Sequence, residues 1–477
     1  MFNNNLKKKR TCPTKLQRSG GYVLIQVIVF GVIAIYLLGA LVGWAVIDIK
    51  ASKQAADRES AIQIAEAGID YYRWHLAHAP TDFQDGTGAI GPYIHNFLDK
   101  NQDVIGQFSL EITPPNLGST LVTIKSTGHT VNNPNLKRTI KVRLAKPSMA
   151  KYAVVANSVM RFGEGTEIYG PIHSNNGIRF DGLAHNIISS AVAAYDDPDD
   201  EGGNEFGVHT HISPIDPLPP NTVPSRTDVF EAGRQFPVPE VDFTGITADM
   251  AVMKTAAQTI DGFWRANSGK LGYHIILKTN DTFDLKKVTK MISSDCTSDE
   301  WSINNETSLG NFPFPTNGII FLEDNVWVDG QINGARLTIV AATLPDSAST
   351  RKSITINNNL LYTNYDNSDV IGLIAQKDIN IGLISADNLR IDAAMIAQKG
   401  RVGRFFYSSS CSPYHIRQSI TLWGMLATNL RYGFAWTNGS GYQIRNLNYD
   451  SELLYGPPPS FPLTSDQYVI LSWEEVK

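Results

Sequence analysis

The feature that most constrains this chain is an uncharged, apolar run from Tyr22 to Ile47, in which Gln26 is the only polar residue of the first turns. A helix of about 20 apolar residues can cross a bilayer. The run exceeds the apolar core of about 7 to 15 residues found in a secretory signal, and no A-x-A-like cleavage site follows it. The leader before it carries six basic residues and no acidic one up to Gly21, so it should stay cytoplasmic. A plain membrane anchor is one interpretation of this stretch.

The helical pattern continues well beyond the apolar run. Apolar residues recur at spacings of three and four until Pro80, which cannot continue a helix. The recurring positions are Ile62, Ala65, Ile69, Tyr72 and Leu76. The sequence therefore predicts one helix over 22–79, with a membrane-crossing half at 22–47 and an amphipathic second half. At about 1.5 Å per residue this helix is about 87 Å long.

Two sequence words carry a resemblance to a known family. The basic leader ends in Gly20-Gly21-Tyr22, and Ala65-Glu66-Ala67-Gly68-Ile69-Asp70 lies in the amphipathic half. This order resembles type IV pilins with a class III leader, in particular minor-pilin-like and pseudopilin-like proteins. The resemblance covers about residues 18–76. It implies that a prepilin peptidase cleaves after Gly21 and that the N-terminal helix contacts the membrane first and other pilin-like subunits later.

Gln26 departs from the pattern of that family. It would be the fifth mature residue, where most pilins carry a glutamate that pairs with the N-terminal amine of a neighbouring subunit. Glutamine supplies no charge for this pairing, which takes place in an apolar core where an unpaired charge is costly. A tip subunit has no subunit ahead of it and can lack the glutamate. The resemblance thus favours a minor or tip subunit over a major one.

Three runs of alternating apolar residues follow the helix in 80–147. Phe108, Leu110 and Ile112 form the first inward set, Val122 and Ile124 or the residues alternating with them form the second, and a third set begins at Ile140. Turn-rich segments separate the runs. The pattern predicts a small three-stranded antiparallel sheet under the amphipathic half-helix, with a boundary at Lys146-Pro147.

Beyond that boundary the sequence repeats short β-rich words. Ile374-Ala375-Gln376-Lys377 recurs 22 residues later as Ile396-Ala397-Gln398-Lys399. Related words begin at Val154, Ile339 and Met425. Such a repeat favours a parallel β-solenoid, in which each coil buries its aliphatic residues on its neighbours, and a β-sandwich is the alternative. The fold class expected for the whole chain is α+β.

The solenoid-like pattern is expected to be interrupted. First coils are predicted at 148–182, an insertion at 183–315, and further coils with a C-terminal cap at 316–477. The insertion has a Pro-rich stretch and a helical pattern over 246–259. Because long insertions on repeating scaffolds often carry binding surfaces, a surface or glycan ligand is expected here.

Charge and cysteine content indicate the compartment and partners. The formal net charge is -5, and loss of the six leader cations would make it about -11, which argues against nucleic acid as a partner. Cys12 lies in the leader. Cys296 and Cys411 remain in the exported part and could form one disulfide, although the sequence does not show that they are close.

Motifs for catalysis are not found, since the sequence has no G-x-S-x-G, H-E-x-x-H, P-loop or paired C-x-x-C pattern. The chain is therefore not expected to be an enzyme or to need a cofactor. One acidic loop offers oxygen ligands for calcium, and a solvated loop is the alternative. Its acidic residues are Asp196, Asp197, Asp199, Asp200 and Glu201.

His209 and His211 stand two residues apart in an extended run. They should face the same side, so they could hold a transition metal together. No third ligand is evident at a useful spacing. The sequence favours surface histidines with no ligand role, and no metal site is assigned with confidence.

These observations favour a minor or tip subunit of a type IV pilus-like filament, with roles in assembly and adhesion. It would be a single-pass inner-membrane protein before assembly and would lie on the pilus or cell surface afterwards. A membrane-anchored envelope scaffold is one alternative. A polysaccharide-cleaving β-helix enzyme is another, but its carboxylates should gather on one solenoid face, and Asp378, Asp387 and Asp392 fall on different coil positions.

Overall fold

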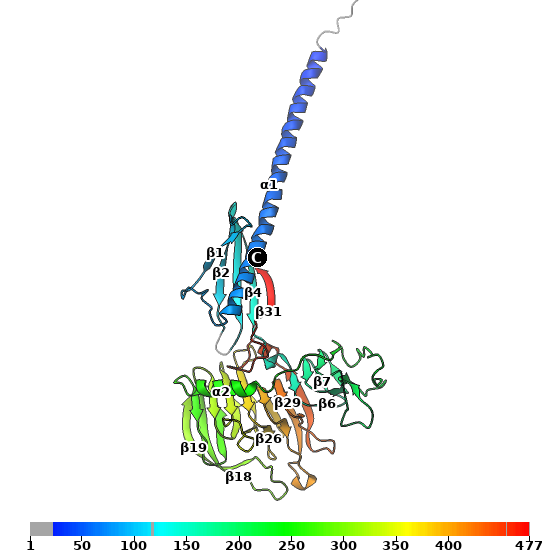
Figure 1. Ribbon diagram of the computed structural model, residues 1–477, viewed down its shortest axis with the longest axis vertical. Coiled ribbons are helices and arrows are strands. Elements are labelled where there is room, and N and C mark those ends of the chain that lie inside the picture. The colour runs from blue at the N-terminus through cyan, green and yellow to red at the C-terminus, as the bar shows by residue number, and fades with distance from the viewer. Residues whose placement is uncertain (1–21, 116–118, 455, 477) are drawn as a thin grey trace, which may run out of the picture.

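A computed structural model describes residues 22–115, 119–454 and 456–476 of the chain. It shows a long helical rod, a small domain around the lower half of the rod, and a large β domain at the end far from the N-terminus (Figure 1). The α+β class predicted from the sequence is confirmed. The predicted processing residues Gly20 and Gly21 lie outside the described residues, whereas Tyr22 is the first residue of the helix.

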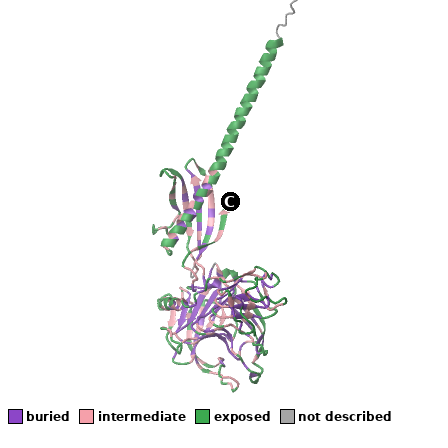
Figure 2. Cartoon of the chain, turned by 45° about the vertical axis from the view of Figure 1, so that its right-hand side comes forward, coloured by how far each residue is buried: buried purple, intermediate pink, exposed green. Residues whose placement is uncertain are grey.

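Helix α1 (Tyr22–His78) is continuous and has the predicted length. Its first half is exposed along its whole length, and burial begins only at Ala61, where the small domain starts (Figure 2). By length and composition α1 can cross a membrane. Seven residues of the second half are buried against the sheet. They are Ala61, Ile64, Ala65, Gly68, Ile69, Tyr72 and Leu76.

The small sheet has five antiparallel strands in place of the three predicted. Their order is β1-β2-β3-β4-β31. The bounds are β1 (Tyr93–Leu98), β2 (Val104–Thr113), β3 (Val122–Thr130), β4 (Asn133–Ala145) and β31 (Val469–Val476). Predicted inward residues such as Leu110, Ile124 and Ile140 meet Tyr72 and Leu76 of α1 in one hydrophobic core. Gly128 of β3 lies so close to α1 that no side chain would fit between them.

The fifth strand corrects a predicted domain boundary. Residues 469–476 were assigned to the C-terminal cap of the large domain, but β31 returns to the small sheet and pairs with β4. Lys141 and Glu474 form an ion pair across this strand pair, at 2.7 Å. Two chain segments therefore connect the domains, and they run side by side: the amide of Thr464 donates to the carbonyl of Pro147 at 2.8 Å.

The large domain is built from parallel strands that stack coil upon coil. One row has the order β16-β20-β22-β25-β27-β29-β5-β8-β11-β15, and all of its pairs are parallel. The bounds in this row are β16 (Phe263–Arg265), β20 (Ile319–Leu322), β22 (Arg336–Ala341), β25 (Val370–Ala375), β27 (Asn388–Ala397), β29 (Ile416–Thr428), β5 (Val154–Ala156), β8 (Ile172–Ser174), β11 (Ile188–Ser190) and β15 (Arg234–Gln235).

The 22-residue recurrence occupies adjacent positions of this row. Ile374 pairs in register with Ile396, in parallel, as predicted from the repeated word. The related sequence segments occupy the next positions of the row, because Ile396 pairs with Ala427 and Ala427 pairs with Val155. The sequence therefore identified a true structural repeat.

The strands from β20 to β5 in this row separate two hydrophobic cores. Alternate residues, including Leu373 and Met395, point into the interior of the stack. Their neighbours Ile374 and Ile396 point outward into a second core, which also contains Met250 and Met253 of helix α2 (Ile246–Ala257). This alternation explains why the strands read as nearly continuous apolar runs.

Further parallel rows complete the coils. The bounds are β17 (Gly272–Leu277), β21 (Val326–Gln331), β23 (Ile354–Thr355), β24 (Leu360–Leu361), β26 (Ile379–Ile381) and β28 (Val402–Arg404), then β6 (Met160–Phe162), β9 (Ile178–Phe180) and β14 (Val208–His209), with β7 (Glu167–Ile168) beside β10 (Leu183–Ala184) and β30 (Gly441–Tyr449) beside β29. Antiparallel strands extend from these rows in two places. One is the hairpin of β12 (Ala194–Tyr195) with β13 (Glu205–Phe206), and the other is β17 followed by β18 (Thr282–Met291) and β19 (Ile303–Pro313).

The prediction that 183–315 lies outside the coils is wrong. Strand β11 continues the row after β8, and β16 and β17 pair in parallel with β20 and β21. The predicted cap at the C-terminus also differs. Residues 456–461 run across the outside of the coils, where Arg336 donates to the carbonyls of Gly456 and Pro457 at 2.9 and 2.7 Å. Cys296 and Cys411, whose pairing the sequence left open, form a disulfide.

Candidate functional site

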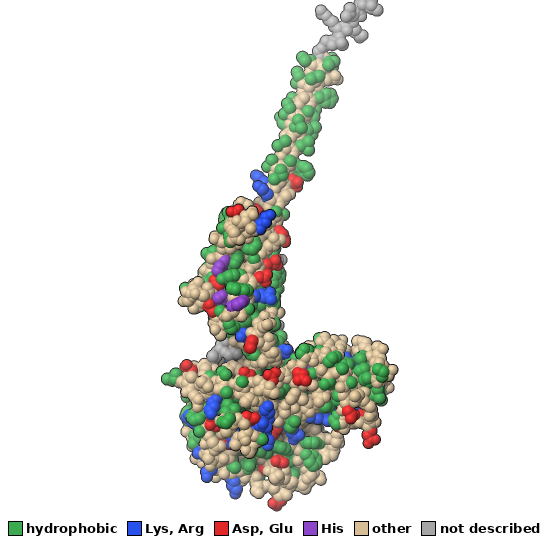
Figure 3. All heavy atoms as spheres, viewed as in Figure 1, with side chains coloured by type: hydrophobic (Ala, Val, Ile, Leu, Met, Phe, Trp, Pro, Cys, Tyr) green, Lys and Arg blue, Asp and Glu red, His purple; other side chains and the backbone are tan. Residues whose placement is uncertain are grey.

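The apolar half of α1 exposes a large hydrophobic surface, which is unfavourable in water. Side chains on all sides of the helix are exposed, from Tyr22 through Phe30 and Tyr36 to Trp44 and Ile47, and they cover the upper rod (Figure 3). Gln26 lies among them and is exposed as well. A surface of this kind needs lipid or other apolar helices around it. It is the part of the molecule that is suited to a membrane and to helix packing.

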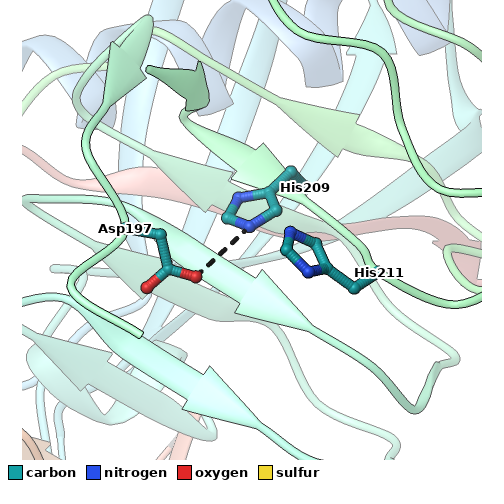
Figure 4. A group of neighbouring side chains, drawn as sticks. All are labelled: Asp197, His209 and His211. Atoms are coloured by element: carbon teal, nitrogen blue, oxygen red, sulfur yellow. Dashed lines mark ion pairs between the residues drawn. The ribbon is translucent and has the colours of Figure 1, made fainter. Parts of the chain in front are cut away.

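A second candidate site lies in the large domain, in the part predicted as an insertion. Asp197, His209 and His211 point toward one another there, and one ligand atom from each lies within 4.8 Å of the others (Figure 4). Asp197 follows β12 in the hairpin loop, His209 ends β14, and His211 lies two residues beyond. The loop and the strand end thus meet at this cluster.

Burial and missing hydrogen bonds distinguish this cluster from an ordinary polar contact. The side chains of His209 and Asp197 are each 1% exposed, and His209 Nε2 is 3.5 Å from Asp197 Oδ2. Among the described residues, neither ring nitrogen of His209 has a hydrogen-bond partner, and neither does Asp197 Oδ2. Burial lowers the pKa of His209 to about 4 despite the nearby carboxylate of Asp197. The ring is therefore neutral at pH 7, which is the form that binds metals.

A neighbouring group shares His211. Asp200, Glu205 and His211 also place one ligand atom each within 4.8 Å of the others. Glu205 is buried, burial raises the pKa of its carboxyl group, and its Oε1 has no hydrogen-bond partner among the described residues. On the adjacent strand β9, Arg179 lies 3.7 Å from Asp197 Oδ2 and 2.7 Å from Asp181.

The five predicted calcium ligands do not come together. Asp196 and Glu201 are exposed and belong to neither group, and Asp199 pairs with Arg431 at 2.6 Å. Asp197 is buried and turned toward the histidines, so it is the third candidate ligand that the sequence did not reveal. The prediction that His209 lies on the surface is wrong. Glu205 was missed, although its place between the acidic run and an apolar strand was a signal for burial.

A different buried histidine has a hydrogen-bond partner at each ring nitrogen. His274 of β17 has Glu306 Oε2 at 2.7 Å from Nδ1 and Asp329 Oδ2 at 3.2 Å from Nε2. Burial alone would lower its pKa, but hydrogen bonds and charges from Asp329 and Glu306 outweigh burial and raise the pKa. These residues line a pocket of about 340 Å³ together with Asn357 and Asn358. Its polar walls are suited to a small polar ligand.

The fold and the exposed helix agree with the architecture expected from the sequence resemblance to type IV pilins. A long helix with an apolar first half packs its second half on a small antiparallel sheet, and a large β domain is inserted between β4 and β31 of that sheet.

The structure is similar to the crystal structure of the competence-associated pilin ComZ from Thermus thermophilus, with 14% sequence identity and a TM-score of 0.32, over 88% of this chain and 98% of that chain. No protein-family model matches the chain, and no curated protein matches it.

Proposed function

We propose that this chain is a minor or tip subunit of a type IV pilus-like filament, with roles in filament assembly and surface adhesion. The single observation that supports this function most is the exposed apolar half of α1, from 22 to about 47, on a helix whose other half is fixed to the small domain. In the membrane, lipid would cover this surface. In a filament, the same surface would pack against helices of other subunits.

Gln26 supports the minor or tip role. In an apolar filament core, an N-terminal amine without a partner carboxylate costs several kcal/mol, so repeated addition of a glutamine-bearing subunit is unfavourable. A subunit used once at the tip avoids this cost. We expect Gln26→Glu to be tolerated and to permit extra incorporation.

The large domain supports the adhesive role. It lies at the end of the molecule far from the apolar half-helix, where it would remain accessible in a filament (Figure 1). The polar pocket beside His274 and Asn358 is one place for a surface or glycan ligand. We assign no catalytic role: Asp392, one of the carboxylates considered for sugar cleavage, is fully buried and accepts hydrogen bonds from the Tyr362 amide and the Tyr365 hydroxyl. A membrane-anchored envelope scaffold is the alternative function.

Leader processing is the first prediction of this proposal. We expect cleavage between Gly21 and Tyr22 in cells with an active prepilin peptidase, because the basic leader and the apolar helix flank that bond. Mass spectrometry of the membrane-extracted protein should show a chain that begins at Tyr22. Gly21→Phe should block cleavage and leave the precursor in the membrane, whereas Gly31→Ala, a helix position with open space around it, should be processed normally. An intact leader in the native chain would favour the scaffold alternative.

A further inference from the structure

The cluster of Asp197, His209 and His211 contains buried polar atoms that the described residues leave unsatisfied. Four buried atoms have no hydrogen-bond partner among the described residues. They are Nδ1 and Nε2 of His209, Asp197 Oδ2 and Glu205 Oε1. A buried polar group without a partner is unfavourable, and buried charges are normally paired or bound to a metal. The cluster is therefore incomplete as a set of protein groups alone.

Two other buried histidines in the same domain have a hydrogen-bond partner at each ring nitrogen. His173 has Ser189 Oγ at 2.9 Å and Asn175 Oδ1 at 3.0 Å from its two ring nitrogens. His274 has a carboxylate oxygen at hydrogen-bond distance from each nitrogen. His209 is as buried as His173, but neither of its ring nitrogens has a hydrogen-bond partner among the described residues. This contrast indicates that a species outside the protein completes the cluster.

We propose that Asp197, His209 and His211 bind a divalent transition-metal ion of the zinc class. Two imidazoles and one carboxylate are a donor set that Zn²⁺ and related ions accept, whereas Ca²⁺ requires six to eight oxygen ligands. Glu205 and Asp200 share His211 in the neighbouring group, so they add two carboxylates beside the proposed ion.

The local charge favours a cation at this position. Asp197, Asp200 and Glu205 bring three carboxylates to the cluster, and Arg179 is the cation paired with Asp197. Arg179 is also engaged by Asp181 at the shorter distance of 2.7 Å, so it neutralises the cluster only in part. A bound divalent ion would compensate the remaining negative charge.

The metal would fasten a loop to the end of the strand stack. The ligands come from the loop between β12 and β13 and from the end of β14, segments that the hairpin brings back together. Short strands of two residues hold this region, and they contribute few hydrogen bonds of their own. The ion would thus order residues 196–211, which makes its role structural.

The test is zinc binding by the full processed chain in detergent. We expect the purified native chain, first stripped with a chelator, to bind one Zn²⁺ and to show a higher melting temperature with Zn²⁺ than without it. Asp197→Asn, which keeps the shape of the side chain, and His211→Gln, at a half-buried position, should weaken Zn²⁺ binding by at least about 100-fold, because even loss of an outer-shell partner costs about 10- to 100-fold. His209→Ala should do the same, with circular dichroism to verify folding.

The matched control is His185→Ala. His185 also lies between two carboxylates, Glu231 at 2.7 Å and Glu167 at 2.9 Å, but it belongs to neither metal group. This variant should bind Zn²⁺ as the native chain does. The proposal is overturned if the native chain binds no Zn²⁺, if Asp197→Asn and His211→Gln bind it unchanged, or if Ca²⁺ raises the melting temperature and Zn²⁺ does not.

Discussion

Replacing Arg404 with leucine is expected to lower the free energy of unfolding of the large domain by about 3 kcal/mol. Arg404 is fully buried, and its guanidinium donates to three backbone carbonyls: Leu383 at 3.0 Å, Tyr414 at 2.7 Å and His415 at 3.1 Å. The rings of Tyr407 and Tyr442 lie beside it. Burial lowers its pKa to about 10, so the side chain is still charged at pH 7.

The physical reason for this loss is that leucine removes the donor to the carbonyl of Tyr414 and one of the donors to the carbonyls of Leu383 and His415. The last two keep other donors, Arg417 at 3.3 Å and the amide of Gly441 at 2.8 Å. Urea unfolding of the purified variant, followed by tryptophan fluorescence, would measure it. Arg404→Lys should recover only part of the stability, since one ammonium group cannot reproduce the planar fork of the guanidinium. Arg351→Leu is the control, because its two 2.9 Å hydrogen bonds to Asp346 lie near the surface and are worth about 1 kcal/mol or less. Equal losses in both variants would contradict the role given to Arg404.

Gly128→Val is expected to destabilise the small domain by about 3 kcal/mol or more, at the upper end of the usual range for overpacking. A side chain at Gly128 would place its first carbon 2.4 Å from the carbonyl oxygen of Ala61 and 2.5 Å from the amide nitrogen of Ala65. These are backbone atoms of α1, so the whole helix would have to move away from β3. The hydrophobic core around Tyr72 would then be opened.

Limited proteolysis and thermal unfolding of the variant would measure this effect. We expect faster cleavage between α1 and the sheet and a lower melting temperature for the small domain. Gly163→Ala is the control, because no heavy atom lies within 4 Å of the added carbon there. A Gly128→Val protein as stable as the native chain would show that α1 does not pack on the sheet as described.

Local patterns predicted the elements whose burial repeats along the sequence. The helix α1 follows from its apolar run and its spacing of three and four, and the stack of parallel strands follows from the recurrence of Ile374 at Ile396. In the second half of α1 one face is buried, so the spacing of apolar residues follows the turn of the helix. The strands are buried on both faces, and there the recurrence follows the length of one coil.

The pairing of strands that are far apart in the sequence could not be predicted from such local patterns. Strand β31 pairs with β4 across more than 300 residues, and its own residues alternate only weakly between half-buried and exposed. The coils 154–190 also stack after β29 rather than before β16, although they come first in the sequence. Strands of two or three residues, such as β11 and β16, are too short to show a period.

The candidate metal site was partly visible in the sequence. The two-residue spacing of His209 and His211 correctly indicated a shared side, and their rings are 5.1 Å apart. Asp197 could not be chosen from the acidic run by its type alone, because Asp196 and Asp199 have the same chemistry and different surroundings. Only the hairpin of β12 and β13 determines which carboxylate turns inward.

The measurement that tests the central proposal most directly is the copy number of this chain in filaments sheared from cells. Because Gln26 brings no carboxylate to a filament core, quantitative mass spectrometry should find the processed chain in the filaments, far below the abundance of the main structural subunit. Deletion of the chain should reduce filament number or adhesion without removing filament bulk. Absence from the filaments, or an abundance equal to that of the main subunit, would contradict a minor or tip role.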